Sequence, residues 1–471
     1  MRMETREYNF DWMLWKTFAA GSRLKCGTAK EFETALRYVP YFRGVLDALF
    51  GAGEPGERFV GLCARYMENL VTARERGRKT AVTTFCFSPA LLYAMDIMPI
   101  CLEVLTVMMT FTYKRGTTEF LDLCNEVGYT ETSCSSQRGT IGAYLAGIGT
   151  QIDMIVTDTP GVCDTNANAF AFASAYLDVP FFQLDMPPVL AGRRSDEYHR
   201  ADYRALIRFL EEHTGRKLDL DRLRANLLEI RRQDELVAEL EELARIVPNP
   251  LPVSFNLMVY ASRFLFSGMT ECTEVLESMV RDGKERARQG LAGVSGGREK
   301  RRAFFCYIDH YAQNLQLWKM LDSLGIGYQG NILSRSWASN APHVAAFGTE
   351  EAAYTVATGD EEALIDSMAA INSRMPMVKS IRGPYDAPDM WLQDTLSLAK
   401  MYSADFIVYN GTPGCRNTWG MVKLLARDAE KAGFPTHIMY ADAFDERVQS
   451  WDATRARFEE FLKVRRLIEW Q

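Results

Sequence analysis

Residues 154–184 read Met154-Ile-Val-Thr-Asp-Thr-Pro-Gly-Val-Cys163-Asp-Thr-Asn-Ala-Asn-Ala-Phe-Ala-Phe-Ala-Ser-Ala-Tyr-Leu177-Asp-Val179-Pro-Phe-Phe-Gln-Leu184. The two ends of this stretch, 154–157 and 179–184, are short runs rich in aliphatic and aromatic residues, which is typical of buried β-strands. We expect a helix over 167–177 between them. A strand, a helix and a second strand in succession indicate a parallel sheet, because parallel strands need a crossover connection.

The same alternation recurs on both sides of this stretch. Further strands are expected at 80–86, 303–308, 406–409 and 437–440. Helices are expected near 89–95, 116–126, 136–146, 314–324, 418–432 and 454–467. The predicted fold class is therefore α/β, with two doubly wound Rossmann-like (flavodoxin-like) parallel-sheet domains and added helical segments.

The chain has 471 residues, more than one hydrophobic core usually supports. Helical periodicity dominates the first eighty residues, and two amphipathic stretches, 219–232 and 234–246, precede a glycine-rich connector at 290–297. We expect four segments: a helical N-terminal segment 1–78, a first α/β domain 79–194, a helical connecting segment 195–297, and a second α/β domain with a closing C-terminal helix 298–471.

Charge and hydropathy exclude two classes of partner. The net charge of −7 argues against nucleic acid, which needs concentrated positive charge to displace counterions. The most apolar run, 90–111, contains Asp96, Pro99 and Glu103, so a membrane span is not expected. The charged N-terminus is not followed by an apolar run, and no secretory signal is predicted. We expect a cytoplasmic protein.

The chain contains ten cysteines but no C-x-x-C pair. A disulfide framework is not expected in a reducing compartment, which leaves metal binding or plain burial. Three cysteines, Cys134, Cys163 and Cys415, lie in small polar turns directly before predicted helices. A helix N-terminus favours an anionic thiolate, so three such sites that converge would suit iron and sulfide. Cys124 is a possible fourth ligand, although its neighbours fit a helix interior better.

Nucleotide-binding motifs are missing from the sequence. It contains neither G-x-x-x-x-G-K-[ST] nor a G-x-G-x-x-G after a predicted strand. If the chemistry requires ATP, another protein has to supply it.

Several short motifs follow one another in an order shared with a known family. They are Gly128-Tyr129 ahead of Cys134, Arg138 and Ala143-Tyr-Leu-Ala-Gly147, Cys163 with Asn166, Val179 to Pro187, Pro252-Val-Ser-Phe-Asn256, Val408-Tyr-Asn410 ahead of Cys415, Gly433-Phe-Pro435 and Asp442. Over residues 75–460 the chain resembles the 2-hydroxyacyl-CoA dehydratase and benzoyl-CoA reductase family. Within it the chain is most similar to the larger subunits of 2-hydroxyglutaryl-CoA dehydratases.

The resemblance implies a cofactor, a reaction and partners. Cys134, Cys163 and Cys415 would hold a [4Fe–4S] cluster whose fourth iron site is open. The implied reaction removes water from an (R)-2-hydroxyacyl-CoA: one injected electron makes a ketyl radical, which expels the α-hydroxyl and leads to a 2-enoyl-CoA. The implied partners are a smaller homologous subunit, in a heterodimer, and a separate ATP-hydrolysing iron–sulfur activator. The resemblance leaves the acyl group open.

Carried onto this sequence, the resemblance suggests further site residues. Arg138 and Arg416 adjoin predicted ligands and would neutralise the cluster or meet CoA phosphates, with surface salt bridges as the alternative. Ser88 is either a substrate contact or a helix N-cap, and the cap is favoured. Asn256 and Asn417 would either form hydrogen bonds with the substrate or cap loops. The candidate acid–base groups are His310, which follows Asp309, and Glu131.

Three other functions remain open from the sequence. A reductase of the same architecture would consume electrons stoichiometrically, as in reduction of an aromatic acyl-CoA. A subunit that relays electrons would carry a cluster without binding acyl-CoA. A scaffold without a cluster would tolerate serine at all three cysteines.

Overall fold

The computed structural model describes residues 40–112, 118–146, 152–158, 163–185, 193–331, 334, 356–373, 375, 378 and 390–468. The chain divides into two compact units. Unit 1 comprises Met1–Gln233, Ala261–Val275 and Val356–Met375, and unit 2 comprises Asp234–Tyr260, Leu276–Thr355 and Pro376–Gln471. The four consecutive segments expected from the sequence stay a prediction.

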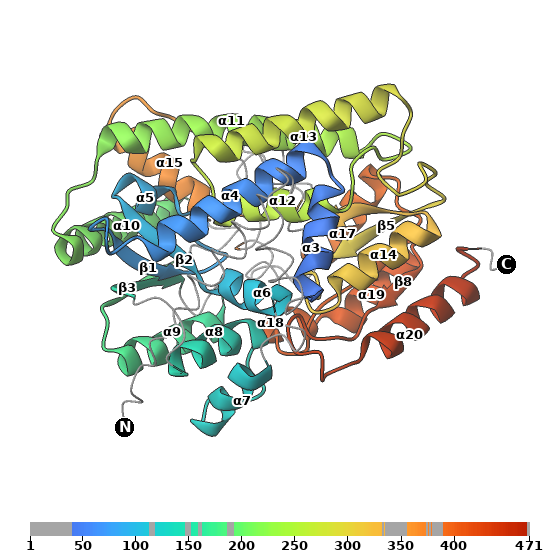
Figure 1. Ribbon diagram of the computed structural model, residues 1–471, viewed down its shortest axis with the longest axis horizontal. Helices are drawn as coiled ribbons and strands as arrows, with labels where there is room; N and C mark the ends of the chain where they lie inside the picture. Colours follow the sequence, from blue (N-terminus) through green and yellow to red (C-terminus); the bar gives the residue numbers. More distant parts are fainter. Residues whose placement is uncertain are drawn as a thin grey trace. The chain divides into compact units, whose positions relative to one another are not determined.

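Unit 1 contains a four-stranded parallel sheet. Its strands are β1 (Lys79–Thr83), β2 (Ile97–Cys101), β3 (Met154–Asp158) and β4 (Phe181–Leu184), in the order β2-β1-β3-β4. The short helix α5 (Ala90–Ala94) lies on one side of the sheet, and α8 (Ser135–Leu145) and α9 (Asp164–Leu177) lie together on the other (Figure 1). The chain moves outward from β1 to β2 and then returns across β1 to β3 and β4. Because each crossover is right-handed, this change of direction places the helix before β2 and the helices after it on opposite faces of the sheet.

Unit 2 repeats this topology. Its strands are β5 (Arg301–Cys306), β6 (Ile326–Asn331), β7 (Phe406–Tyr409) and β8 (Thr436–Ile438), in the order β6-β5-β7-β8, again all parallel. Side chains of α14 (Asn314–Leu324) and α20 (Trp451–Val464) share one apolar cluster with β5 and β7, whereas α17 (Met390–Met401) packs against α19 (Val422–Lys431). The two parallel sheets confirm the predicted α/β fold class.

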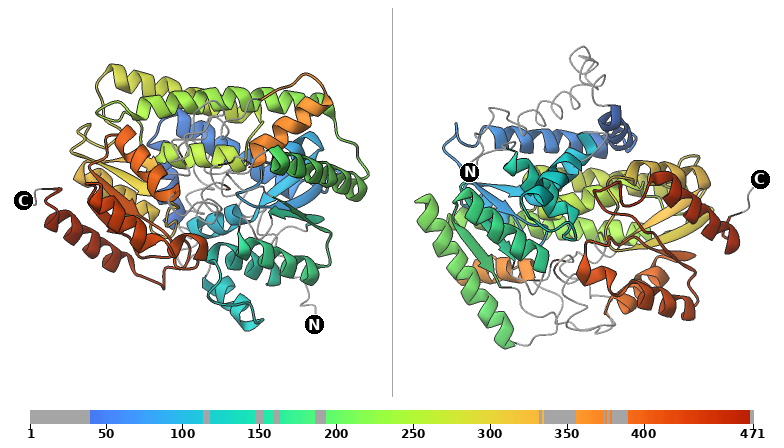
Figure 2. Two further views of the ribbon diagram at one scale, coloured as in Figure 1. Left: turned by 180° about the vertical axis from the view of Figure 1, so that it is seen from behind. Right: turned by 90° about the horizontal axis from the view of Figure 1, so that it is seen from below.

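Further helices complete the described chain, as the turned views in Figure 2 show. They are α3 (Pro40–Phe50), α4 (Glu54–Val71), α6 (Leu102–Thr112), α7 (Thr118–Glu126), α10 (Arg193–Thr214), α11 (Leu220–Ala244), α12 (Ser254–Phe264), α13 (Thr270–Arg288), α15 (Glu361–Ser373) and the one-turn α18 (Arg416–Trp419). No helix in the described part of the chain is both long and apolar enough to cross a bilayer.

Two of the strands, β2 and β6, are not predicted from the sequence. β2 contains Pro99, and β6 contains Gly327 and Gly330, residue types that are depleted in strands. Both strands lie at the edge of their sheet, where a missing N–H or a weakened strand is tolerated. Tertiary pairing with the central strands β1 and β5 therefore creates them against their local propensity.

Helix boundaries also differ from expectation in two places. The predicted helices 219–232 and 234–246 are one helix, α11. The intervening Gln233 is buried, and its amide nitrogen donates to the carbonyl of Met269 at 3.0 Å. Conversely, the predicted helix 418–432 is broken at Gly420, where α18 ends before α19 begins.

Close packing of α8 on α7 yields a stability prediction. A Cβ on Gly142 would lie 2.0 Å from the carbonyl oxygen of Phe120, which belongs to the α7 backbone and cannot rotate away. We expect Gly142→Ala to destabilise the protein by about 1–3 kcal/mol through this overpacking. The measurement is the midpoint of thermal unfolding.

The matched control is Gly61→Ala in α4, where an added Cβ meets no atom within 4 Å. Since alanine favours helix, this variant should gain about 0.5–1 kcal/mol. Equal midpoints for the two variants would contradict the proposed helix contact.

Candidate functional site

The strand order places the chemically relevant loops at two switch points. In sheets ordered β2-β1-β3-β4 and β6-β5-β7-β8, the crossovers from the first strand and from the third strand run in opposite directions. Ligands in such sheets bind beyond the carboxyl ends of the strands at this point. Residues 84–88 follow β1 and Cys163 follows β3, whereas Tyr307 to His310 follow β5 and residues 410–415 follow β7.

Two of the three predicted ligands lie near each other in unit 1. Cys163 caps α9, and its Sγ accepts the backbone N–H of Asn166 at 3.4 Å. Cys134 caps α8. The side-chain amide of Gln137 donates to Oδ1 of Asn166, which joins the first turns of the two helices.

The pKa of Tyr129 depends on burial and on the neighbouring thiols. Burial is the main cause that raises the pKa of its phenol to about 12. A hydrogen bond with Ser133 lowers this pKa, and the thiols of Cys134, Cys124 and Cys163 raise it. Because α8 and α9 contact each other and their first turns are joined by Gln137 and Asn166, the structure places Cys134 and Cys163 in one region of unit 1, although they are 29 positions apart in the sequence.

Cys415 is the N-cap of α18 in unit 2. Its Sγ lies 3.3 Å from the hydroxyl oxygen of Tyr307, and its backbone N–H donates to the carbonyl of Thr412 at 2.9 Å. Because Cys415 and the pair Cys134 and Cys163 belong to different units, their convergence on one cluster stays a prediction. Within each described unit, no group of three or more His, Cys, Asp or Glu side chains forms a metal site.

Burial divides the described cysteines into two groups. Cys134, Cys163 and Cys415 are partly exposed, and the others are buried: Cys63, Cys86, Cys101, Cys124, Cys272 and Cys306. Burial raises the pKa of the Cys124, Cys272 and Cys306 thiols to about 12. Since iron binds the thiolate, the partly exposed, helix-capping group is the donor set that fits a cluster.

Cys124 behaves as a core residue. It lies inside α7, and its S–H donates to the carbonyl of Arg138 at 3.1 Å. The guanidinium of Arg138 is itself buried, and its Nε donates to the carbonyl of Ser133 at 3.1 Å. Arg138 therefore supports the turn that precedes Cys134, while Glu131 is exposed in that turn.

The expectation that Ser88 caps a helix is wrong. Helix α5 begins after Pro89, and no side chain caps it. The backbone N–H of Ser88 donates to Oδ1 of Asn372 at 2.8 Å, but the buried Oγ of Ser88 has no hydrogen-bond partner among the described residues. A buried hydroxyl without a partner is costly, which is compatible with a contact to a ligand.

Glu103 is a candidate that sequence reasoning missed. Its side chain is 4% exposed, and its Oε2 accepts the backbone N–H of Phe85 at 3.2 Å and the S–H of Cys101 at 3.4 Å. The carboxyl group thus lies against the loop that leads to Ser88. The signal in the sequence was a carboxylate within the apolar run 90–111, a residue type that is rarely buried without a reason.

His310 and Asp309 lie buried after β5. The Nε2 of His310 is 3.0 Å from the carbonyl oxygen of Gly411, so this nitrogen carries the proton and Nδ1 is an acceptor. Nδ1 has no partner among the described residues, and burial lowers the pKa of the imidazole. Oδ1 of Asp309 accepts from the hydroxyl of Tyr328 at 2.9 Å, and burial raises the pKa of Asp309 to about 6.

The remaining predicted polar contacts are less informative. Asn256 uses both ends of its side-chain amide within the chain, since Nδ2 donates to the carbonyl of Val253 and Oδ1 accepts from Ser334. Arg416 and Asn417 begin α18, and their side chains lie outside the described part of the structure.

Comparison with known families decides the affiliation. Residues 84–464 match the family described as 2-hydroxyglutaryl-CoA dehydratase, D-component. The chain belongs to this family. No curated protein matches the chain. The match covers all three predicted cysteine ligands together with Ser88 and His310, and it implies a component of a 2-hydroxyacyl-CoA dehydratase assembly with hydro-lyase activity.

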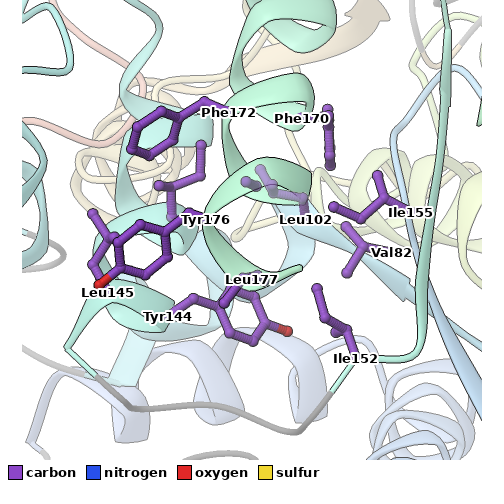
Figure 3. A pocket seen from close by; sticks show the side chains of 12 residues that line it. Val82, Leu102, Tyr144, Leu145, Ile152, Ile155, Phe170, Phe172, Tyr176 and Leu177 are labelled. Carbon is purple, nitrogen blue, oxygen red and sulfur yellow. The ribbon is translucent and has the colours of Figure 1, made fainter. Parts of the chain in front are cut away.

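Unit 1 of this dehydratase component also contains a pocket, which lies away from Cys134 and Cys163 of the same unit (Figure 3). Its walls are apolar and include Leu145 and Leu177, which end α8 and α9. Cys134 and Cys163 cap the opposite ends of the same two helices. Within unit 1 the pocket is therefore a packing feature of the sheet face, at the other end of these helices from Cys134 and Cys163.

The environment of Asp309 predicts a pH-dependent stability. Its pKa rises from 3.8 in the unfolded chain to about 6 in the folded protein. The folded state then holds its proton more tightly, so stability falls as pH rises from about 4 through 6. Relative to Asp309→Asn, the wild type should lose up to about 3 kcal/mol over this range. Urea unfolding of both proteins between pH 4 and 8 measures the difference, and a constant difference would contradict a buried Asp309.

Proposed function

We propose that the chain is a subunit of an oxygen-sensitive iron–sulfur (R)-2-hydroxyacyl-CoA dehydratase, which removes water to give a 2-enoyl-CoA. Cys134, Cys163 and Cys415 would hold its [4Fe–4S] cluster. The observation that carries the proposal is the division of the described cysteines. Within the family match, these three stand at helix N-cap positions and are partly exposed, while the others are buried.

The cluster, when bound, would supply a site for one electron and an open iron that can act as a Lewis acid. The chain supplies the surroundings. The N–H of Asn166 already donates to the sulfur of Cys163, which stabilises negative charge there. The buried guanidinium of Arg138 adds a positive charge behind the turn of Cys134.

Two polar atoms are suited to contact a substrate. The hydroxyl of Ser88 is able to donate a hydrogen bond, and Nδ1 of His310 is able to accept a proton. Each follows the first strand of its own sheet, at the switch point where ligands bind. In this proposal Ser88 orients an acyl-CoA oxygen and His310 receives a proton, while Glu131, exposed in its turn, is the weaker candidate base.

The family membership supports a partner requirement. A chain described as one component of a dehydratase acts with others. As the family resemblance implies, this assembly would include a smaller homologous subunit and a separate ATP-hydrolysing iron–sulfur activator. The sequence contains neither a P-loop nor a dinucleotide fingerprint, so use of ATP would fall to the activator.

The ligand assignment predicts the iron content. Anaerobically purified wild-type protein should contain about four irons and four acid-labile sulfides per chain, and Cys163→Ser should lose most of them because a ligand is missing. Cys124→Ser is the matched control, since its sulfur is buried and hydrogen-bonded within unit 1. Equal iron in all three proteins would contradict the assignment, and so would wild-type protein without iron after reconstitution.

Electron stoichiometry tests the reaction. The complete assembly, with its activator, ATP and a (R)-2-hydroxyacyl-CoA, should form many molecules of 2-enoyl-CoA for each electron supplied, because the electron returns after each turnover. A benzoyl-CoA-reductase-like enzyme would instead consume reductant in proportion to product. Binding of a cluster without any binding of acyl-CoA would point to electron relay alone.

A further inference from the structure

Tyr307 has an unusual backbone conformation. It directly follows β5, and its φ of 89° lies in the left-handed region that side chains other than glycine rarely adopt. For a bulky aromatic residue this conformation is strained. The side chain is nevertheless 3% exposed, and its ring packs on Trp391 with centroids 4.9 Å apart. The surrounding fold therefore holds the ring in one direction.

In this backbone conformation the phenol of Tyr307 points toward the sulfur of Cys415. The hydroxyl oxygen of Tyr307 lies 3.3 Å from Sγ of Cys415, within the range of an O–H···S hydrogen bond. A second tyrosine near this cysteine, Tyr409, uses its hydroxyl differently and donates to the carbonyl of Thr418 at 2.7 Å. Of these two phenols, that of Tyr307 is the one whose hydroxyl lies within hydrogen-bond distance of the sulfur.

Packing by itself does not require a tyrosine here. Phenylalanine would place the same ring on Trp391 and would bury no hydroxyl. A buried phenol needs a polar partner, and the sulfur of Cys415 is the partner that the geometry provides. When Cys415 is a thiolate it has no proton to give, so the phenol must be the donor.

We propose that Tyr307 is a positioning residue that donates a hydrogen bond to the cluster-bound sulfur of Cys415 and thereby raises the reduction potential of the cluster. The inference rests on the proposed function, because it requires Cys415 to bind iron. A hydrogen bond to a ligand sulfur stabilises the more negative, reduced form, since charge-assisted hydrogen bonds are stronger than neutral ones. Cluster potentials depend on such hydrogen bonds.

The test compares Tyr307→Phe with wild type in a redox titration followed by EPR. Both proteins are purified anaerobically, and iron per chain is measured first. We expect unchanged iron content and a midpoint potential lower by about a tenfold change in the one-electron equilibrium, which is ~59 mV. The matched control is Tyr409→Phe, which removes a neighbouring phenol whose hydroxyl donates to the carbonyl of Thr418 and not to the sulfur. Its potential should change much less than that of Tyr307→Phe.

A second measurement reports the hydrogen bond directly. Pulsed EPR of the reduced protein in D2O should detect exchangeable deuterons coupled to the cluster, including that of the Asn166 amide, in all three proteins. Wild type and Tyr409→Phe should show one further coupling, from the phenol of Tyr307, and Tyr307→Phe should lack it. If all three proteins hold a cluster with equal potentials and equal deuteron couplings, the role of Tyr307 is refuted and the proposed function stands. If wild type binds no iron, the proposed function itself fails, and the inference falls with it.

Discussion

The reversal of crossover direction between the two central strands is the constraint on which the candidate chemistry depends. In a parallel sheet every strand ends at the same edge, and each following helix begins there. Cys163 and Cys415 occupy corresponding places, because each follows the third strand of its own sheet and caps the next helix. Ser88 and His310 correspond as well, each after the first strand. One repeated topology thus supplies corresponding candidate residues in each unit.

At the carboxyl ends of the strands, each unit contains groups that lower its stability. Buried polar groups normally find partners, yet the hydroxyl of Ser88 and Nδ1 of His310 have none among the described residues, and Tyr307 holds a strained backbone. In the core of each unit, by contrast, apolar side chains pack on both faces of the sheet, and the buried cysteines act as small hydrophobic residues. Such a contrast between a strained edge and a relaxed core is typical of functional sites.

Sequence reasoning succeeded where local pattern and tertiary environment agree. Strands such as β7 and helices such as α14 were predicted with their bounds, because apolar runs and turn residues delimit them. It failed at β2 and β6, where pairing overrides proline and glycine, and at Ser88, whose expected capping bond does not form. Glu103 was missed as a site candidate because its partner groups on Phe85 and Cys101 come together only in the folded sheet.

The sequence by itself determined the α/β class, the family resemblance and the choice of three turn cysteines as candidate ligands, because these depend on residue types and their order along the chain. The sequence also indicated that Cys124 is buried, and the structure confirms it. Tertiary structure alone decided which described polar groups remain without partners. It also decided that the phenol of Tyr307 meets Cys415 across more than a hundred residues of chain. Burial and hydrogen bonding depend on distance in space, and no local pattern encodes that distance.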